Sequence, residues 1–365
     1  MKKIGIMSMQ RIQNYGSFLQ AYGLKKTIES LGYSVCFVDY KYENPVIDNK
    51  NDGSLKRLIR KIKRNVNFFV FFRNRQFNKK WNNIFKESCK KYLNIGNYYY
   101  AYNKIDELVI GSDEVFNCLQ GFPVGYSREL FGKNYESIPV ISYAACFGNA
   151  SLDRIKEYKI DNEIGEMLSK FKAISVRDSN SFNIVYELTK NKPFINLDPV
   201  LITDFSKETI DNVKIKDYIL LYAYSGRLTK GECKYIKNFA KKNKKKIVSI
   251  GTFQKIADYN FAIDPFEIFA YFKHADFVIT DTFHGTIFSI KTHTNFATII
   301  RNGKIGNSNK LEDLLDRIGK KENIIKNIQD INNIYKNNTD FTSIDKILKR
   351  ETKKSVEYLK NNLIM

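Results

Sequence analysis

The sequence predicts an α/β protein with two Rossmann-like domains that face each other across a cleft. Short apolar runs rich in Val and Ile alternate with segments of helical periodicity along most of the chain, which is typical of parallel sheets covered by helices. A length of 365 residues suits two domains. Several apolar runs end in polar clusters, as expected where the carboxyl edge of a parallel sheet forms a site.

The first predicted unit consists of a strand at 3–8, a helix at 17–31 and a strand at 34–39. The helix has apolar residues at helical spacing, and Gly32 stands where a glycine often closes a helix. The connecting loop, 9–16, lacks the G-x-G-x-x-G and Walker spacings. An ordinary dinucleotide or nucleoside triphosphate cradle is therefore not expected there.

Polar residues at the end of that loop are candidates for ligand binding. Asn14, Tyr15 and Gly16 stand at the predicted helix N-terminus, and Gln20 follows one turn later. Free backbone N–H groups and polar side chains at such a terminus suit a carboxylate, a phosphate or a sugar hydroxyl. The same residues also fit an ordinary strand-to-helix turn.

Residues 54–85 form a strongly basic segment, with ten Lys or Arg residues and no acidic residue. Their apolar residues have helical spacing. One interpretation is an amphipathic helix on an anionic membrane surface, where Arg57, Arg60, Lys61 and Arg64 would meet the lipid. The other is a connecting helix whose apolar face packs on the domain.

The rest of the first half contains three more strands and one helix, and their ends carry further candidates. Ser112 and Asp113 follow one predicted strand, and Arg177 follows another. Polar clusters after consecutive strands are expected at a sheet edge that forms a site. The predicted strands are 105–110, 139–144 and 173–176, and the predicted helix is 153–171.

The second half repeats the alternation after Leu197-Asp198-Pro199, which looks like a junction. We expect an N-terminal domain at 1–198 with a basic helical insertion at about 41–104, a second domain at 199–340, and a C-terminal helix at 341–365 that packs back across the first domain. The predicted strands are 218–224, 246–250, 276–280 and 295–300, and the predicted helices are 229–242, 265–273, 309–318 and 343–361.

The stretch 274–296 contains all three histidines of the chain. A buried strand ends at Asp281 and Thr282, and a helix begins near His284 and Gly285. This arrangement presents free N–H groups and a titratable imidazole at one sheet edge, where anionic substrates bind. Alternatively, the Asp and Thr only cap the helix and the histidine is a satisfied, partly buried residue.

Composition limits the class of protein. The formal net charge of +21 fits a nucleic acid, an anionic membrane surface or acidic small substrates, or only an excess of solvated lysines. No stacking-aromatic nucleic-acid motif is visible, so nucleic acid is the least favoured partner. The five cysteines are scattered, which suits reduced thiols in the cytoplasm, and no structural metal is expected. We see no signal peptide and no membrane span.

Several of these segments together resemble the polysaccharide pyruvyl transferase family. The matches keep the family order from residue 4 to about residue 319. The N-Y-G-x-x-L-Q-A-Y and S/T-F-H-G-T patterns are the most specific. The matching segments are IGIMSMQRIQNYGSFLQAYGLKKTIESLGYSVCFVDY, VIGSDEVFN, ISYAACFG, ISVRDSNS, LDPVLITD, ADFVITDTFHGTIFSIKTHTNF and NSNKLEDLLDRIG.

The resemblance implies a fold similar to the two-domain GT-B glycosyltransferases. It also implies transfer of the pyruvyl group of phosphoenolpyruvate onto two hydroxyls of a sugar, forming a cyclic ketal and releasing phosphate. Products of this kind decorate surface and capsular polysaccharides. Phosphoenolpyruvate would be the donor substrate, with no cofactor. The acceptor would be lipid-linked or nucleotide-linked, and the enzyme cytoplasmic or peripheral to the inner face of the membrane.

The same chemistry suggests roles for the candidates. His284 would protonate C3 of the donor or hold its phosphate, Arg177 would grip phosphate or carboxylate, and Asp113 would act as a base or bind sugar hydroxyls. Asn14 and Gly16 would form the opposite wall of the cleft. If the first two side chains face solvent in that cleft, substituting them should leave folding intact.

The chain departs from the family pattern at a position where some relatives have an arginine that contributes to phosphate binding. Some relatives have Arg-Leu-His where this chain has Thr282-Phe283-His284, so Arg177, Arg301 or a lysine would replace that arginine. Two other functions stay open. One is a GT-B glycosyltransferase that uses a nucleotide sugar, and the other is a non-catalytic glycan-binding relative. Released phosphate, released nucleotide or neither would distinguish the three.

Overall fold

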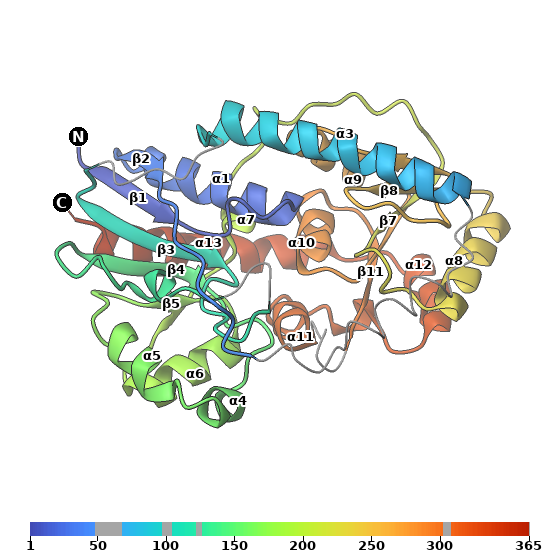
Figure 1. Cartoon of the computed structure of the whole chain (residues 1–365). Coiled ribbons are helices and arrows are strands. Elements are labelled where there is room, and N and C mark those ends of the chain that lie inside the picture. The colour runs from blue at the N-terminus through green and yellow to red at the C-terminus, as the bar shows by residue number, and fades with distance from the viewer. Residues whose placement is uncertain (48–67, 97–103, 122–125, 302–307, 365) are drawn as a thin grey trace.

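The computed structural model describes residues 1–47, 68–96, 104–121, 126–301 and 308–364. It contains two six-stranded sheets in which every pairing between named strands is parallel (Figure 1). Helices cover both sheets, so the predicted α/β class with two Rossmann-like units is confirmed.

The first sheet has the strand order β2-β1-β3-β4-β5-β6. Ile4, Ile6, Val109 and Ile141 are fully buried in it, as predicted for one shared sheet. The chain reverses its direction of travel across the sheet after β2, which is the topological switch of an open α/β fold. Its strands are β1 (Lys3–Met7), β2 (Ser34–Phe37), β3 (Glu107–Asp113), β4 (Val140–Ala145), β5 (Ser175–Val176) and β6 (Phe194–Ile195).

The second sheet has the order β12-β11-β10-β7-β8-β9. Val278 and Ile279 lie in its interior strand β10, so the prediction of two separate sheets is confirmed. Its strands are β7 (Tyr218–Tyr222), β8 (Lys246–Ile250), β9 (Tyr259–Phe261), β10 (Phe277–Thr280), β11 (Phe296–Ile299) and β12 (Ile324–Ile325).

The helices predicted at 17–31, 229–242, 265–273, 309–318 and 343–361 are present with ends close to the predicted ones, whereas α6, α7 and α12 were not predicted. The α-helices are α1 (Tyr15–Ser30), α3 (Phe68–Leu93), α4 (Leu152–Glu157), α5 (Asp161–Leu168), α6 (Ser179–Thr189), α7 (Pro199–Ile202), α8 (Lys230–Lys242), α9 (Ile268–Lys273), α10 (Phe283–Lys291), α11 (Ser308–Arg317), α12 (Ile331–Lys336) and α13 (Phe341–Asn362). The 3₁₀ turns are η2 (Arg128–Phe131), η3 (Pro265–Glu267), η4 (Lys321–Asn323) and η5 (Ile328–Asp330).

The prediction of one helix at 153–171 is wrong, because the chain breaks there into α4 and α5. Lys159 adopts a φ of 56°, which a continuous right-handed helix does not allow. Asp161 then starts the second helix with an acidic side chain in its first turn, where the helix dipole favours negative charge.

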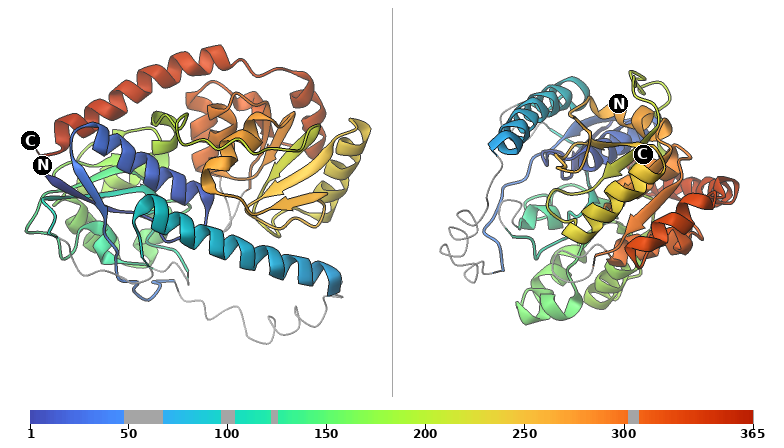
Figure 2. Two further views of the ribbon diagram at one scale, coloured as in Figure 1. Left: turned by 90° about the horizontal axis from the view of Figure 1, so that it is seen from above. Right: turned by 90° about the vertical axis from the view of Figure 1, so that its right-hand side faces the viewer.

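Two long helices join the sheets, and they run along opposite sides of the molecule (Figure 2, left). The inner face of α3 contacts both halves, since Trp81 packs against Tyr15 with the two rings tilted by 45°, and Phe77 packs against Phe253. The C-terminal helix α13 returns to the first sheet as predicted. There, the Tyr358 hydroxyl donates to the Ser142 carbonyl (2.8 Å), and Leu359 is fully buried.

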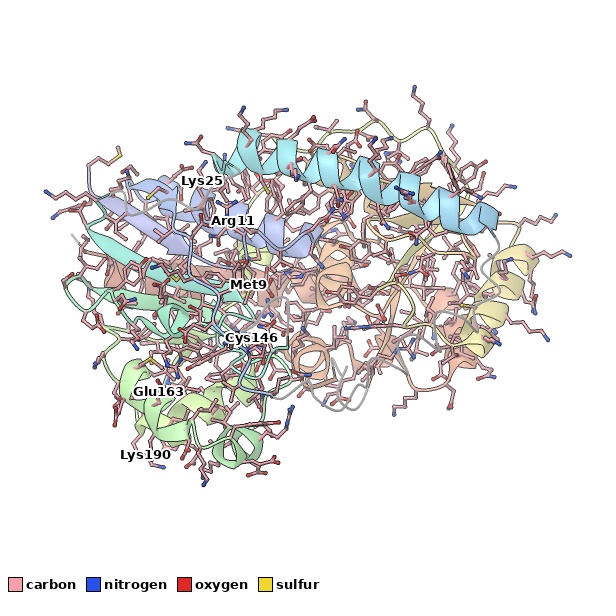
Figure 3. All side chains as sticks on the ribbon, in the orientation of Figure 1. Met9, Arg11, Lys25, Cys146, Glu163 and Lys190 are labelled. Atoms are coloured by element: carbon pink, nitrogen blue, oxygen red, sulfur yellow. The ribbon has the colours of Figure 1, made fainter. Side chains whose placement is uncertain are left out.

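The contacts of α3 bear on the choice between the two interpretations of the basic segment, a membrane-surface helix or a connecting helix. Its apolar residues face inward, as expected for a connecting helix, while its described Lys and Arg side chains are exposed. Side chains that end in nitrogen atoms also extend from many other parts of the surface (Figure 3), so they are not confined to α3. The predicted lipid-facing residues Arg57, Arg60, Lys61 and Arg64 lie outside the described residues. Of the helices in the described ranges, none is both long and apolar enough to cross a membrane.

Candidate functional site

The N-termini of α1 and α10 meet where the two halves adjoin, and Gly16 makes this approach possible. Asn14 caps α1, and its side-chain oxygen accepts a hydrogen bond from the Gly16 N–H (2.7 Å). A Cβ atom on Gly16 would overlap the His284 imidazole at Nδ1 and Cγ and would lie 2.7 Å from its Cβ. The glycine of this predicted turn is therefore required for close packing against the histidine.

On the other side of this contact, Thr282 caps α10. Its hydroxyl accepts from the Gly285 N–H (2.9 Å). A Cβ on Gly285 would lie 2.7 Å from both Thr282 Oγ1 and Tyr222 Cδ1. The capping interpretation of Thr282 is thus confirmed, and the same cap fixes His284 in the first turn of the helix.

Arg177 stands at the end of β5 and reaches the histidine through Asp198. Its Nη1 lies 2.8 Å from Asp198 Oδ2, and His284 Nε2 lies 3.4 Å from the same oxygen. The second contact does not have the geometry of a hydrogen bond, and it is an ion pair only when the imidazole is protonated. The Arg177 guanidinium also lies 4.2 Å from the centroid of the Phe283 ring, a favourable cation–π contact.

Three buried nitrogens of this group have no hydrogen-bond partner among the described residues: Arg177 Nε, Arg177 Nη2 and His284 Nε2. Both residues are buried. Buried donors are almost always satisfied in native proteins, so unsatisfied ones call for an explanation. An anion with several acceptor oxygens would satisfy them.

Asp198 is ionised in this environment. Its burial would raise its pKa, but the charges of His284 and Arg177, together with a hydrogen bond from the Val200 N–H, lower that pKa to about 2. Asp198 also caps the short helix α7. One carboxylate therefore fixes the segment between the two sheets and balances the arginine charge.

Asp113 joins the same cluster from β3. Its Oδ2 accepts from the Ser17 hydroxyl (2.7 Å), its Oδ1 accepts from the Glu114 N–H (3.0 Å), and Oδ1 lies 3.8 Å from Arg177 Nη2. Ser112 lies behind it with a buried hydroxyl that has no partner. We call Arg177, Asp198, His284 and Asp113 the buried cluster.

Gln20 lies beside the cluster but is not exposed to a ligand. Its amide nitrogen donates to Ser8 Oγ (2.8 Å) and to the Ser17 carbonyl (2.9 Å). The side chain is fully buried. Gln20 therefore ties the start of α1 to the end of β1.

Lys310 brings a second cation to this region. Its Nζ lies 2.5 Å from Glu114 Oε1 and 5.9 Å from the centroid of the Phe283 ring. Burial would raise the pKa of Glu114, but Lys310 lowers it to about 2. Lys310 therefore lies close to Phe283, the residue that follows Thr282.

Arg301 is placed differently. Its Nη1 and Nη2 lie 2.7 Å and 3.1 Å from the two carboxylate oxygens of Glu232 in the first turn of α8. A phosphate would have to compete with this two-pronged pair. Of the predicted replacements for the missing arginine, Arg177 and Lys310 are the better placed.

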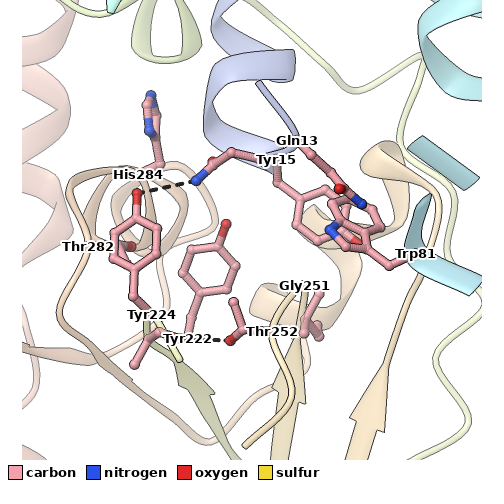
Figure 4. A pocket seen from close by; sticks show the side chains of 12 residues that line it. Gln13, Tyr15, Trp81, Tyr222, Tyr224, Gly251, Thr252, Thr282 and His284 are labelled. Atoms are coloured by element: carbon pink, nitrogen blue, oxygen red, sulfur yellow. Dashed lines mark hydrogen bonds between the residues drawn. The ribbon is translucent and has the colours of Figure 1, made fainter. Parts of the chain in front are cut away.

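A pocket of about 110 Å³ opens next to this arrangement (Figure 4). That volume is far more than the ~15 Å³ that one water molecule needs, so it admits a small molecule. The predicted residues Asn14, Tyr15, Thr282 and His284 line it. The His284 ring points away from Tyr222 and Thr252, so the imidazole lies in the wall of the pocket and not in its middle (Figure 4).

The structure therefore brings Asn14–Gly16, Asp113, Arg177 and His284 close together. We predicted that they line one cleft, but Asp113 and Arg177 are not among the residues that line the pocket. The structure does not leave Arg177 and His284 facing solvent, because they are only 3% and 8% exposed. We predicted that substituting these residues would leave folding intact if their side chains faced solvent. Because both are buried, that prediction does not apply. A buried guanidinium that pairs with Asp198 is part of the protein's internal charge balance as well as a candidate ligand group.

Sequence reasoning missed several residues of the site. Asp198 and Lys310 stand within LDPVLITD and NSNKLEDLLDRIG, so the motifs could have indicated them. Nothing in the sequence pattern indicated Trp81 or Tyr222, because only the fold brings α3 to the end of β7. Within the described ranges, no three His, Cys, Asp or Glu side chains are grouped so that they could hold a metal ion.

Comparison with known proteins concerns the family and the fold. A family model described as polysaccharide pyruvyl transferase matches residues 14–303. No curated protein matches the chain. The glycosyltransferase of kitacinnamycin has a similar fold, with a TM-score of 0.51 at 10% identity over 100% of this chain and 99% of that one.

Two further solved structures are similar at lower TM-scores. The UDP complex of S. aureus MnaA has a TM-score of 0.48 at 10% identity, over 100% of this chain and 98% of that one. The UDP-GlcNAc 2-epimerase of Methanocaldococcus jannaschii has 0.46 at 15% identity, over 97% and 100%. At such identities these similarities concern the fold alone.

Proposed function

Because the chain belongs to the polysaccharide pyruvyl transferase family, we propose that it transfers the pyruvyl group of phosphoenolpyruvate to a sugar. The product is a cyclic ketal on two hydroxyls of a surface or capsular polysaccharide precursor, and phosphate is released. The observation that carries this proposal is the trio of unsatisfied buried nitrogens on Arg177 and His284.

The donor would satisfy those nitrogens. Phosphoenolpyruvate carries a carboxylate and a phosphate, and charge-assisted hydrogen bonds to such groups are the strongest that side chains make. Nε and Nη2 of Arg177 lie on one edge of the guanidinium and match two oxygens of either group. Lys310 and the N-termini of α1 and α10 add positive potential nearby.

The reaction needs one proton donor and one acceptor. A protonated His284 Nε2 supplies a proton to C3 of the donor, which becomes a methyl group, while C2 becomes electrophilic. The first sugar hydroxyl adds to C2 and loses its proton to a carboxylate, for which Asp113 is the candidate. The C2–O bond to phosphate then breaks, and phosphate leaves with its electron pair and takes up the proton held by Asp113. The second hydroxyl closes the ketal at C2 and gives its proton to His284 Nε2, which restores the imidazolium.

Asp198 would position the histidine for this step. It contacts His284 Nε2 and Arg177 Nη1 through one oxygen, so the acid and the donor-binding group are held relative to each other. The carboxylate also balances the charge of a protonated imidazole. We regard Asp198 as a positioning residue and not as an acid or base.

The proposal is tested by incubating the protein with phosphoenolpyruvate and lipid-linked or nucleotide-linked sugars. Release of phosphate and gain of a pyruvyl group by the sugar, measured by mass spectrometry, should occur together. His284→Ala should lower turnover by ~10²–10⁴. His274→Ala is the matched control, since His274 is exposed and pairs only with Asp211 at the surface (2.8 Å).

Two results would count against the proposal. Release of a nucleotide without phosphate would indicate glycosyl transfer. Full turnover in a folded His284→Ala protein would remove the histidine from the chemistry. Arg177→Lys should raise the KM for phosphoenolpyruvate, because an ammonium keeps the charge and loses the planar pair of donors; its folded fraction must be measured, since the side chain is buried.

A further inference from the structure

We propose that the pocket in Figure 4 binds the acceptor as an uncharged pyranose ring, at a subsite separate from the anion-binding nitrogens. This inference rests on the proposed function. It concerns a different set of side chains, contributed by the loop before α1, by α3 and by the ends of β7 and β8.

The first argument is the charge of the lining. Among the described residues that line the pocket, His284 is the only ionisable acid or base other than tyrosine. Three arginine and lysine side chains lie outside the lining, with Arg177 beside Asp198, Lys310 beside Glu114, and Arg227 against the Tyr224 ring (4.2 Å). A carboxylate or phosphate in the pocket would lose its hydration and have His284 as its one charged partner in the described lining. The lining therefore favours a neutral molecule.

The second argument is the combination of aromatic faces and hydrogen-bonding groups. Trp81, Tyr15 and Tyr222 line the pocket together with the amides of Gln13 and Asn14. Aromatic rings carry a negative face that attracts weakly positive C–H groups, and a pyranose presents such C–H groups on its faces and hydroxyls at its edges. This mixture fits a sugar better than it fits a purely apolar ligand.

The third argument is a polar group without a partner. Tyr222 is 7% exposed, and its hydroxyl makes no hydrogen bond within the described residues. Its neighbours are already engaged, since Thr252 donates to the Ala223 carbonyl (2.7 Å) and Asn14 donates to the Tyr224 hydroxyl (3.2 Å). The Tyr222 hydroxyl is thus available for a ligand hydroxyl.

The indole of Trp81 is held in place in the wall of the pocket. With the Gln13 amide oriented to satisfy its neighbours, its oxygen accepts from Trp81 Nε1 (3.2 Å) and its nitrogen donates to Asn82 Oδ1 (2.7 Å). The Tyr15 ring lies 4.2 Å from the indole, centroid to centroid. A ring fixed in this way loses little conformational entropy when a ligand packs on it.

The pocket also lies next to the residues that we propose carry out the reaction. His284 and Asn14 both line the pocket, and His284 contacts Asp198 of the buried cluster. A sugar in the pocket would therefore lie beside the wall that separates it from the donor. The inference predicts that the residue to be pyruvylated is a neutral hexose or N-acetylhexosamine, and that uronic acids and sugar phosphates bind poorly.

A direct test uses the fluorescence of Trp81, which is the only tryptophan of the chain. We would titrate the full chain with methyl glycosides of glucose, galactose, mannose and N-acetylglucosamine, and in parallel with methyl glucuronide and UDP. At least one neutral glycoside should change the emission saturably, with a Kd on the order of 1 mM. The two charged probes should bind at least tenfold more weakly or not at all.

Tyr222→Phe removes only the hydroxyl, and it should weaken the best neutral glycoside by about 3–10-fold. Tyr259→Phe is the matched control, since Tyr259 is an exposed tyrosine on β9, and it should bind as the wild type does. Equal binding by the Tyr222→Phe protein, tighter binding of UDP or glucuronide, or no response to any neutral glycoside would overturn the inference.

These results can be separated from a failure of the proposed function. Binding of phosphoenolpyruvate, measured by calorimetry, depends on Arg177 and not on Trp81 or Tyr222. If the donor binds and is turned over while no neutral glycoside reaches Trp81, only the subsite is wrong. If neutral glycosides bind while the donor is neither bound nor consumed, the subsite stands and the pyruvyl transfer does not.

Discussion

Replacing Gly16 with alanine should damage the site more than any other single methyl group added to the start of α1. In a helix, alanine is ordinarily more stable than glycine by ~0.5–1 kcal/mol. At this position the new Cβ would overlap the His284 ring and lie 2.7 Å from its Cβ, whereas ordinary contacts are 3.4–4 Å. The imidazole or the helix must therefore move by about 1 Å, a displacement that can cost ~10² in rate.

We expect Gly16→Ala to lose ~1–3 kcal/mol of unfolding free energy through overpacking and at least ~10² in turnover. Urea denaturation and the coupled phosphate-release and mass assay would measure the two effects. Gly231→Ala in α8 is the matched control, because outside the helix backbone the nearest atom to its Cβ would be Thr229 Oγ1 at 3.9 Å. That variant should be as stable as the wild type or more stable.

A Gly16→Ala protein with wild-type stability and turnover would refute the close approach of α1 and α10. Stability loss with full turnover would refute only the role of the histidine. Helix propensity cannot produce either loss, since it favours alanine. The comparison with Gly231 therefore isolates the contact with His284.

Three further predictions concern the charges and the core. Asp198, with a folded pKa of about 2 that lies below the ordinary value of 3.8, should contribute ~2 kcal/mol above about pH 4 and lose it as pH falls through about 2. Asp198→Asn should flatten the acid limb of urea stability between pH 2 and 5, and parallel limbs would contradict this. Lys310→Met should raise the KM for phosphoenolpyruvate while leaving neutral-glycoside binding unchanged, and an unchanged KM would exclude the lysine from the donor site. Leu359→Ala in α13 should cost ~2–5 kcal/mol by denaturation, since Leu359 is fully buried on the first sheet, and a loss under 1 kcal/mol would mean that the helix does not pack there.

Most strands and long helices could be predicted from the sequence, because the periodicity of hydrophobic residues determines where they form. Apolar runs of four or more residues, such as 246–250 and 277–280, became strands. The strands that were missed, β6, β9 and β12, have only two or three residues, which is too short for a period to be seen. The predicted helix at 153–171 failed because its apolar spacing continues across the break at Lys159.

The candidate site was predictable only in part, for a physical reason. Polar residues that follow strands in the sequence, such as Asp113, Arg177 and His284, are brought together by the parallel edge of each sheet. Their burial was not predictable, because it depends on how closely α1 and α10 approach. The partner of Arg177 was not predictable either, since Asp198 belongs to a connecting segment whose position is set by both sheets.

The charge balance of the buried cluster limits how the donor can bind. Arg177 is faced by two carboxylates, Asp198 and Asp113, and Lys310 is already paired with Glu114. Among the described side chains of this region, no excess positive charge is left while His284 is neutral. An anion that entered such a site would meet net repulsion in a medium of low dielectric. Protonation of His284 adds one positive charge, and the N-termini of α1 and α10 add about half a charge each. In the proposed mechanism, the proton that His284 would give to C3 would therefore also make the site attractive to the donor, so binding and acid catalysis would depend on a single protonation.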